Sequence, residues 1–320
     1  MRSQISKFRL LGIRAEPVEI IADTQITLKA LFAAPFLKDD KPFIFNAQAA
    51  WIIMNPASLT PGSLPEFIIN VTDVNKNGES ILDSNNLNFP KELINFIVDS
   101  GNSSSLTFPV YLLGCNNGKI DTDAARDAIL DIGQKTDLSL LEKACTGKDS
   151  QSLSAFKNLT IFDSKNDNKD ISSLNHNPQI DKLLSETIIC EGSDGCREPK
   201  AIKIALTPES FEYYYDYFGE LRNEMEDIYV DWYSDGGEFS FSRVRSEDSV
   251  KALETRDKGY IDSHGNFTLQ INEDSHWFNV TWLPPVEGGT FKLWATVRDL
   301  RGGIGWKQYT LKAIAPDYKK

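Results

Sequence analysis

A short polar segment carries residue types that bind calcium. In residues 73–83 (DVNKNGESILD), oxygen-bearing side chains alternate at Asp73, Asn75 and Asn77, and a glycine takes the sixth position. A hard cation needs several oxygens about 2.4 Å away, supplied by one tightly curled loop such as that of an EF-hand. The opening half of that pattern is present, whereas Asp83 lies one place before the closing position. We expect either calcium, held by Asp73, Asn75, Asn77 and Asp83, or a solvated turn that uses the same asparagines and glycine.

A run of tyrosines is the second feature with binding chemistry. Residues 211–218 (FEYYYDYF) contain Tyr213, Tyr214, Tyr215 and Tyr217. Neighbouring side chains of a strand point to opposite faces, so some of these rings must be exposed. Exposed aromatic rings bind sugars as flat platforms, or they anchor a protein partner. We therefore expect a contact surface at these four tyrosines.

Tryptophan is concentrated in the C-terminal third of the chain. Five of the six tryptophans follow residue 230, and we expect those on alternating strands to fill a core. In residues 297–303 a glycine pair predicts a tight turn, and Asp299 is placed to accept hydrogen bonds from its amides. Trp294 and Trp306 then stand on the two strands that the turn joins, which indicates a structural role.

Enzyme motifs are missing from the sequence. It contains no Gly-x-Ser-x-Gly elbow, no His-Glu-x-x-His and no phosphate-binding glycine loop followed by Lys-Ser/Thr. Residues 262–264 and 274–276 both read Asp-Ser-His, but adjacent side chains of a strand face opposite ways and cannot form a relay. We expect a protein that is not an enzyme and needs no cofactor.

The four cysteines indicate the compartment. Cys115, Cys145, Cys190 and Cys196 lack the spacing of a zinc or redox motif, and only three histidines are present to complete a metal site. Two local disulfides, Cys115–Cys145 and Cys190–Cys196, would each close a short loop in an oxidising compartment. The alternative is four buried thiols in a cytosolic protein.

Charge and composition exclude several partners. The chain of 320 residues has 34 basic and 46 acidic side chains, a formal net charge of −12, so we expect no nucleic acid and no direct membrane contact. No apolar run approaches the roughly 20 residues that span a bilayer. No apolar signal segment follows Met1, and with the cysteines in mind we interpret Met1 as a replacement start on a processed form.

Period-two alternation predicts a mainly β protein of two immunoglobulin-like sandwiches. The strands predicted for the first sandwich are residues 8–20, 24–32, 43–54 and 105–113. Helical spacing in residues 123–130 and 138–144, with Thr122 as N-cap, predicts a helical insertion in this domain. We expect the first domain to span residues 1–152 and the second to span residues 153–320.

The second sandwich is predicted from a further series of apolar segments. These are residues 187–190, 201–206, 227–233, 279–282, 290–297 and 305–311. The first two flank the second cysteine pair, so we expect them to form a hairpin whose tip is closed by the Cys190–Cys196 disulfide.

Four segments carry a resemblance to a known group. Residues 10–17 (LLGIRAEP), 175–178 (NHNP), 232–239 (WYSDGGEF) and 293–306 (LWATVRDLRGGIGW) together resemble lipoproteins of gliding and predatory bacteria. The resemblance implies an extracytoplasmic protein with immunoglobulin-like domains, anchored by an acylated cysteine just before the present N-terminus. It implies no activity and no catalytic residues, and the lipid-carrying cysteine itself is not in this sequence.

The function expected from these features is non-enzymatic. We expect an extracytoplasmic lipoprotein, anchored at the outer membrane, periplasmic or on the cell surface, that acts as a structural or protein-binding module of the cell envelope, with another envelope protein as partner. The alternative is a carbohydrate-binding surface protein that uses its exposed aromatic rings for adhesion to a surface glycan.

Overall fold

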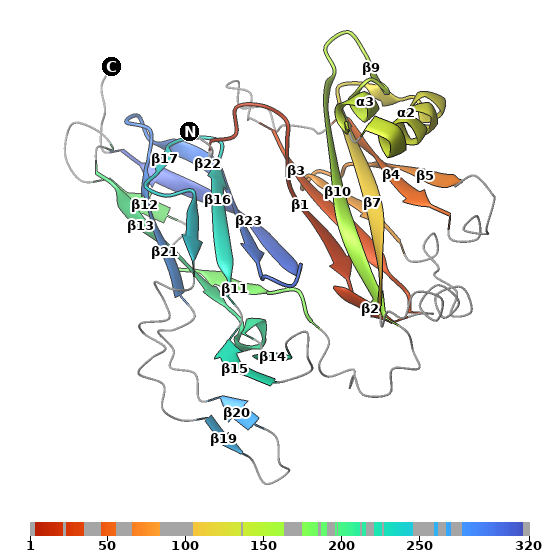
Figure 1. The fold of residues 1–320 in the computed structure, drawn as a ribbon. Coiled ribbons are helices and arrows are strands. Elements are labelled where there is room, and N and C mark those ends of the chain that lie inside the picture. Colours follow the sequence, from red (N-terminus) through yellow and green to blue (C-terminus); the bar gives the residue numbers. More distant parts are fainter. Residues whose placement is uncertain are drawn as a thin grey trace. The chain divides into compact units, whose positions relative to one another are not determined.

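The chain folds into two compact units, both built mainly from β-strands (Figure 1). The first unit is Ser6–His176, and the second is Asn177–Lys320 together with Met1–Ile5. The computed structural model describes residues 4–21, 24–34, 46–55, 66–83, 105–135, 137–162, 175–184, 187–190, 196, 198–211, 213–215, 221–225, 227–245, 259–261, 267–269 and 277–315.

The boundary between the two units does not coincide with the predicted domain boundary. That boundary, between residues 152 and 153, lies inside strand β10 (Gln151–Phe162), which pairs with one neighbour along its whole length and so belongs to the first unit. At the N-terminus, the Ile5 amide donates to the Ser234 carbonyl at 2.8 Å, and Gln4 forms a parallel bridge with Ser234. The first five residues therefore belong to the second unit, a long-range pairing that no local pattern reveals.

Two sheets form the sandwich of the first unit. The three-stranded sheet has the order β1 (Arg9–Glu16), β3 (Thr27–Ala33), β6 (Glu79–Leu82). The five-stranded sheet has the order β2 (Glu19–Ile21), β10, β7 (Ser105–Asn116), β4 (Ala47–Met54), β5 (Phe67–Asp73). All pairs are antiparallel except β2 with β10, which is parallel.

One hydrophobic core fills the space between these two sheets. Side chains alternate along β4, so Trp51 and Ile53 enter this core and meet Phe32 of β3 and Leu112 of β7. Trp51 is fully buried, and its indole N–H donates to the Ser80 hydroxyl at 2.9 Å. The polar atom of this large ring is thereby satisfied, as burial of a tryptophan requires.

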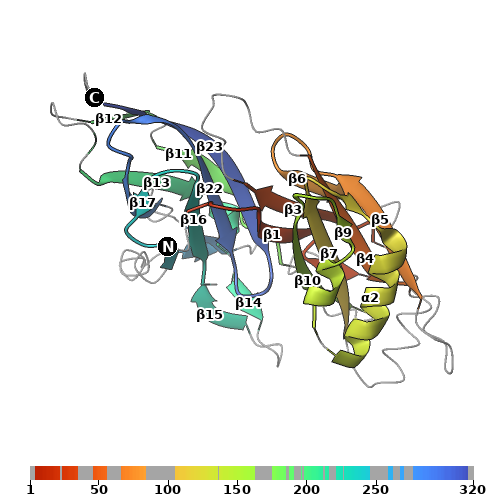
Figure 2. The ribbon, with the colours of Figure 1, turned by 90° about the horizontal axis from the view of Figure 1, so that it is seen from above.

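The opposite face of the five-stranded sheet is covered by helices. Ile52 of β4 and Leu113 of β7 pack there against Ile129 of α2 (Thr122–Lys135) and Leu141 of α3 (Ser139–Glu142). Figure 2 shows α2 lying across this face. The predicted helical insertion is thus confirmed as a third layer of the first unit.

The helical layer is capped and cross-linked at one end. The carboxylate of Asp121 accepts the amides of Asp123 and Ala124, each at 3.0 Å, so the N-cap is Asp121 and the prediction of Thr122 was wrong by one residue. The predicted Cys115–Cys145 disulfide is present, with Cα atoms 5.4 Å apart. It links the end of β7 to β9 (Cys145–Thr146), which pairs with β8 (Lys119–Ile120).

The second unit contains a similar pair of sheets. The five-stranded sheet has the order β12 (Thr187–Ile189), β23 (Ile304–Ile314), β22 (Gly289–Arg298), β16 (Tyr229–Ser234), β18 (Arg243–Arg245). The four-stranded sheet has the order β11 (Ile180–Leu183), β13 (Lys200–Leu206), β21 (Trp277–Leu283), β17 (Glu238–Phe239). Smaller elements are a 3-10 helix (Pro208–Ser210), β14 (Tyr213–Tyr215) with β15 (Leu221–Met225), and β19 (Gly259–Ile261) with β20 (Phe267–Leu269).

Tryptophans form the centre of the second core. Trp232 and Trp282 are fully buried, and the indole N–H of Trp282 donates to the Gly236 carbonyl at 3.0 Å. Gly237 has a φ of 75°, and a side chain there would collide with the Trp282 ring. The prediction that tryptophans fill a core is confirmed for these two. Trp294 is also buried, but its neighbours Leu293 and Ala295 are the residues of β22 that enter this core.

The second disulfide is confirmed, but the hairpin predicted around it was wrong. Cys190 and Cys196 are bonded, with Cα atoms 5.0 Å apart. The flanking strand β12 pairs with β23, whereas β13 pairs with β11 and β21 in the other sheet. Alternation in the sequence identified both segments as strands, but it could not show that they lie in different sheets.

The two units repeat the same connection at their N-terminal ends. In the first unit, β1 is antiparallel to β3 in one sheet, and the next strand, β2, is parallel to the last strand, β10, in the other. In the second unit, β11 is antiparallel to β13, and β12 is parallel to the last strand, β23.

Among the residues that the structure describes, no helix is long and apolar enough to cross a membrane.

Candidate functional site

Three of the four predicted calcium ligands, Asp73, Asn75 and Asn77, lie at the turn between β5 and β6. Asn75 uses its side-chain oxygen to accept the amides of Asn77 and Glu79 at 2.9 and 3.0 Å. Asp73 ends β5 and is exposed, and its carboxylate accepts a hydrogen bond from the side-chain amide of Gln48 at 3.4 Å. These contacts are those of an Asx turn, the second of the two interpretations of the sequence.

Asp83 is not brought to this turn. It follows β6, so four extended residues, about 13 Å at roughly 3.3 Å per residue, separate it from Glu79 at the start of that strand. Calcium ligands must all lie within about 2.6 Å of one ion. Within the described ranges, moreover, no three His, Cys, Asp or Glu side chains cluster so as to hold a metal. Calcium binding at Asp73, Asn75 and Asn77 stays a prediction.

The tyrosine run is only partly described. Tyr213, Tyr214 and Tyr215 form strand β14, which pairs with β15, and Tyr217 lies outside the described residues. The contact surface expected there stays a prediction. The same holds for the two Asp-Ser-His segments, residues 262–264 and 274–276, which also lie outside the described ranges.

The turn between β22 and β23 has its expected structure. The Gly303 amide donates to the Asp299 carboxylate at 2.7 Å, and the Asp299 amide donates to the Gly303 carbonyl at 3.2 Å. Gly302 has a φ of 96°, a conformation that favours glycine. Trp294 and Trp306 lie on the two strands that this turn joins, as predicted.

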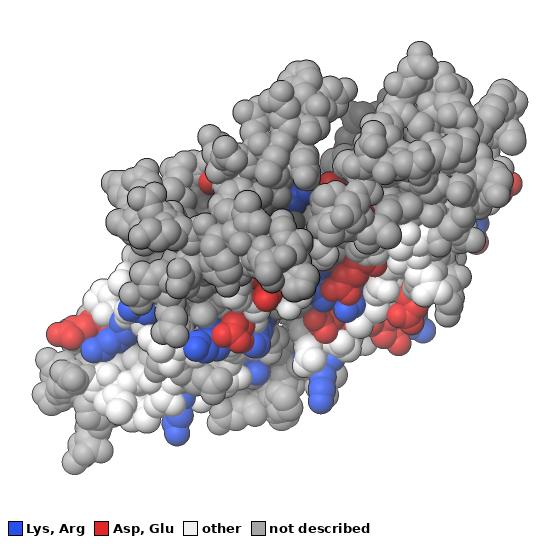
Figure 3. Space-filling model, turned by 90° about the horizontal axis from the view of Figure 1, so that it is seen from below, with Lys and Arg blue, Asp and Glu red and all other residues white. Residues whose placement is uncertain are grey.

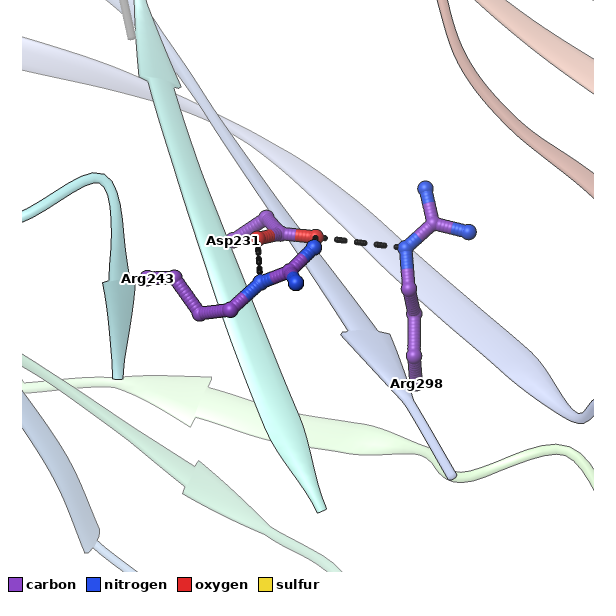
Figure 4. A network of polar contacts seen from close by, with 3 residues as sticks. All are labelled: Asp231, Arg243 and Arg298. Atoms are coloured by element: carbon purple, nitrogen blue, oxygen red, sulfur yellow. Dashed lines mark hydrogen bonds and ion pairs between the residues drawn. The ribbon is translucent and has the colours of Figure 1, made fainter. Parts of the chain in front are cut away.

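A polar cluster that the sequence analysis missed lies on β16, β18 and β22 (Figure 4). Val230 and Trp232 of β16 enter the second core, so alternation turns Tyr229, Asp231 and Tyr233 to the opposite face of the sheet. The strand register places Arg243 of β18 directly opposite Asp231. On the other side, β22 places Arg298 opposite Tyr229. We call Asp231, Arg243 and Arg298, with Tyr229 and Tyr233, the arginine cluster.

Asp231 is the centre of the arginine cluster. Its side chain is 7% exposed, and Arg243 binds it through two parallel hydrogen bonds, Nε to Oδ1 at 2.6 Å and Nη2 to Oδ2 at 3.0 Å. Arg298 adds a third, Nε to Oδ2 at 3.2 Å. Bidentate arginine–carboxylate pairs are among the strongest charge-assisted hydrogen bonds. The cluster therefore ties three adjacent strands together.

The electrostatics of the arginine cluster favour the charged form of Arg243. Hydrogen bonding to Asp231 raises the pKa of Arg243 above its ordinary value. Burial raises the pKa of Tyr233 above 10.0, and the negative charge of Asp231 acts in the same direction, so the phenol stays protonated at neutral pH. Two cations against one anion leave the cluster with a net charge of +1. It differs in this from the chain as a whole, whose net charge is −12.

Arg243 is the member of the cluster that is open to solvent. Its side chain is 57% exposed, and its guanidinium lies over the Tyr229 ring, 5.6 Å from the ring centre. A guanidinium has five N–H groups, and the two bonds to Asp231 leave three of them to bind a further acceptor. Figure 3 shows acidic and basic side chains interspersed on one face of the described surface. The Arg243 guanidinium is a cation that the buried carboxylate of Asp231 holds in a fixed orientation.

The sequence shows the alternation of the strands that carry this cluster, but it does not show that these strands pair. The segments Tyr229–Asp231 and Arg243–Arg245 both alternate polar and apolar residues, as sheet strands with one polar face do. Nothing in either segment indicates that they pair with each other, or that Arg298 arrives from a third strand.

Comparisons with known proteins found distant structural similarity only. No family model matches the chain, and no curated protein matches it. Among solved structures it is similar to Escherichia coli alpha-2-macroglobulin activated by porcine elastase, with 9% identity over 97% of this chain and 22% of that chain, at a TM-score of 0.24. A tetra-tandem repeat from the extending region of a large adhesion protein gives 10% identity over 97% and 50%, at 0.24. Red sea bream transglutaminase gives 9% over 99% and 32%, at 0.23.

These likenesses do not transfer a function. The chain spans half or less of the length of each of these three structures. At TM-scores this low, the similarity establishes neither a shared fold nor a shared activity.

Proposed function

We propose that this chain is a non-enzymatic, extracytoplasmic protein-binding module of the cell envelope, built from two immunoglobulin-like sandwiches. The resemblance of its sequence segments to lipoproteins supports a tether through an acylated cysteine. The two disulfides favour an oxidising compartment, where such bonds persist. The observation that carries the binding role is the exposed guanidinium of Arg243, fixed by Asp231 and stacked on Tyr229.

The strand orders support the immunoglobulin-like part of this proposal. In the second unit, the order β11-β13-β21-β17 in one sheet and β23-β22-β16 in the other matches the A-B-E-D and G-F-C arrangement of immunoglobulin domains. A buried tryptophan on the third main strand is a further hallmark of that fold. Trp51 of β4 and Trp232 of β16 occupy that place in the two units.

The chemistry of the arginine cluster favours an acidic group on the partner. Arginine and tyrosine are enriched among the residues that contribute most to protein–protein binding. Asp231 holds the Arg243 guanidinium in one orientation, so little side-chain entropy is lost when a partner binds. The three remaining N–H groups suit a carboxylate. The proposed partner is therefore an envelope protein that presents Asp or Glu to this surface.

Quantitative co-purification with solubilised envelope proteins tests this role. We expect Arg243→Ala to reduce capture at least about tenfold, because a hydrogen bond to a charged group contributes about 1.5 to 3 kcal/mol. Arg126→Ala is the matched control, since Arg126 also pairs with an aspartate, at 2.9 Å, and is 51% exposed. Equal capture by both variants would contradict the proposal.

A glycan array separates the proposal from the carbohydrate alternative. Binding to an acidic glycan that is lost on Tyr214→Ala or Tyr215→Ala would favour a role in adhesion to sugars. Capture of a protein that persists after enzymatic deglycosylation, and that depends on Arg243, supports the protein-binding role.

A further inference from the structure

Within the part of the chain that the structure describes, strand β5 (Phe67–Asp73) is an open edge of the five-stranded sheet in the first unit. It pairs with β4 on one side and ends the sheet order on the other. Figures 1 and 2 both show it as the outermost strand of this sheet. An unpaired edge presents a row of amide and carbonyl groups to which another strand can bind.

The hydrogen bonds at the two ends of β5 show which of its residues face β4. The Asn55 amide donates to the Glu66 carbonyl at 2.7 Å, and the Val74 amide donates to the Ala47 carbonyl at 2.9 Å. Both bonds join residues that lie opposite each other when the β4–β5 register is continued at its ends. In an antiparallel pair, residues that bond the neighbour alternate with residues that do not. Even-numbered residues from 66 to 74 therefore direct their backbone groups toward β4.

The odd-numbered residues direct their backbone groups to the open side. These are Phe67, Ile69, Val71 and Asp73, which together present four amides and four carbonyls. Within the described residues, none of these eight groups has a backbone partner across the open edge. The register with β4 runs through all seven residues without a bulge.

Among the described sheets of three or more strands, the other edge strands are protected. In β1 the register shifts between Leu10 and Gly12, and Glu16 forms ion pairs with Arg14 and Lys29, each at 3.0 Å. The remaining edge strands, β2, β6, β11, β12, β17 and β18, have only two to four residues each. Bulges, charges and short length are the devices that block edge pairing. β5 has none of them, since only its last residue is charged.

The side chains of β5 indicate the chemistry of its partner. Ile68 and Val71 are 38% and 39% exposed and face opposite sides of the sheet, so each side offers an apolar contact. Acidic residues, Glu66 and Asp73, lie at the two ends. An apolar strand with basic ends complements this edge. A second copy of the chain does not, because it brings the same acidic ends and a formal net charge of −12.

We propose that β5 binds an extended segment of a partner protein by β-augmentation, and that the segment alternates β-branched residues between lysines or arginines. Backbone hydrogen bonds to the four odd-numbered residues provide affinity, and the flanking charges provide selectivity. This site lies on the first unit and uses none of the arginine cluster, so it stands apart from the proposed role of Arg243.

A labelled synthetic peptide, Lys-Val-Thr-Val-Thr-Val-Lys, is the probe for this site. Fluorescence anisotropy with the whole chain is expected to show saturable binding below about 1 mM, and at least about tenfold weaker binding when both lysines are replaced by glutamates. Val71→Pro removes one outward amide while leaving the bonds to β4 intact, and it should weaken binding at least about tenfold. Val71→Lys, which places a charge on the edge, is the second variant.

The controls separate this site from a fold defect and from the arginine cluster. Circular dichroism and the thermal midpoint establish whether each Val71 variant is folded, and a variant that fails this check is replaced by the other. Arg243→Ala should bind the peptide as the parent chain does. Peptide binding that is absent, or that is unaffected by both Val71 variants, would overturn the proposal. Concentration-dependent dimerisation abolished by those variants would assign the edge to a second copy and overturn it as well.

Discussion

Asp235 gives the sharpest prediction about stability and pH. Its carboxylate accepts the Lys292 amide at 2.8 Å, but burial raises its pKa from 3.8 to about 6. The native chain therefore holds this proton more tightly than the unfolded chain between about pH 4 and pH 6. The protonated carboxyl group contributes its full stabilisation of the native state below about pH 4, and this contribution is lost as the pH rises to about 6.

The expected magnitude follows from this pKa. A rise of the pKa from 3.8 to about 6 corresponds to a change of at most about 3 kcal/mol in the free energy of unfolding, at about 1.4 kcal/mol per pKa unit. Asp235 is only partly buried, and screening by solvent reduces this to about 1 to 2 kcal/mol. Asp235→Asn removes the charge and keeps an oxygen for the Lys292 amide. We expect it to stabilise the second unit by about 1 to 2 kcal/mol at pH 7.5 and to have almost no effect at pH 4.

Urea unfolding at pH 4, 5, 6 and 7.5, followed by tryptophan fluorescence, measures this difference. Five of the six tryptophans lie in the second unit, so the signal reports mainly on it. Asp181→Asn, at an exposed residue of β11, controls for the loss of one negative charge from a chain of net charge −12. A stabilisation that is the same at every pH, or that Asp181→Asn reproduces, would refute the reasoning.

Three other contacts give predictions that denaturant unfolding can check. Replacing Cys115 and Cys145 together by serine opens a cross-link between residues 30 apart, and we expect a loss of about 3 to 4 kcal/mol; a loss below about 1 kcal/mol would count against the entropic account. Trp51→Phe removes the buried hydrogen bond to Ser80 and should destabilise the first unit by about 1 to 2 kcal/mol; adding Ser80→Ala should destabilise it further, because the Ser80 hydroxyl also bonds the Thr72 hydroxyl at 2.7 Å. Asp231→Ala leaves two guanidinium groups side by side without their carboxylate, and it should cost about 2 kcal/mol, more than removal of either arginine. Equal costs for these variants would contradict that account of the cluster.

Contacts that are local in sequence were predictable. The Asp299 turn and the helical insertion between β7 and β10 follow from residue types a few positions apart. The disulfides Cys115–Cys145 and Cys190–Cys196 join cysteines within one segment, where a short loop makes closure inexpensive in entropy. The exact N-cap of the helix still depended on local geometry, because Asp121 occupies the N-cap position that was predicted for Thr122.

The predicted calcium residues illustrate where residue types leave two interpretations open. Asp73, Asn75 and Asn77 have the composition of a calcium loop, but in the observed turn the Asn75 side chain accepts two backbone amides and the Asp73 carboxylate accepts the side-chain amide of Gln48. Asparagine oxygens accept amide hydrogens as readily as they bind a cation, so composition alone cannot separate the two roles. Only the path of the chain through β6 shows that Asp83 lies too far away to complete the set.

By itself, the sequence determined that this chain forms strands and which side chains of each strand share a face, because these depend on period-two alternation. It also favoured the cysteine pairing that is observed, because each pair lies at a short separation. Tertiary structure alone decided which strands become neighbours. It joined residues 4 and 5 to Ser234, gathered Asp231, Arg243 and Arg298 from three strands, and left β5 as an open edge. The physical reason is that alternation fixes the direction of a side chain, whereas the neighbour of a strand is selected by packing among residues far apart in the chain.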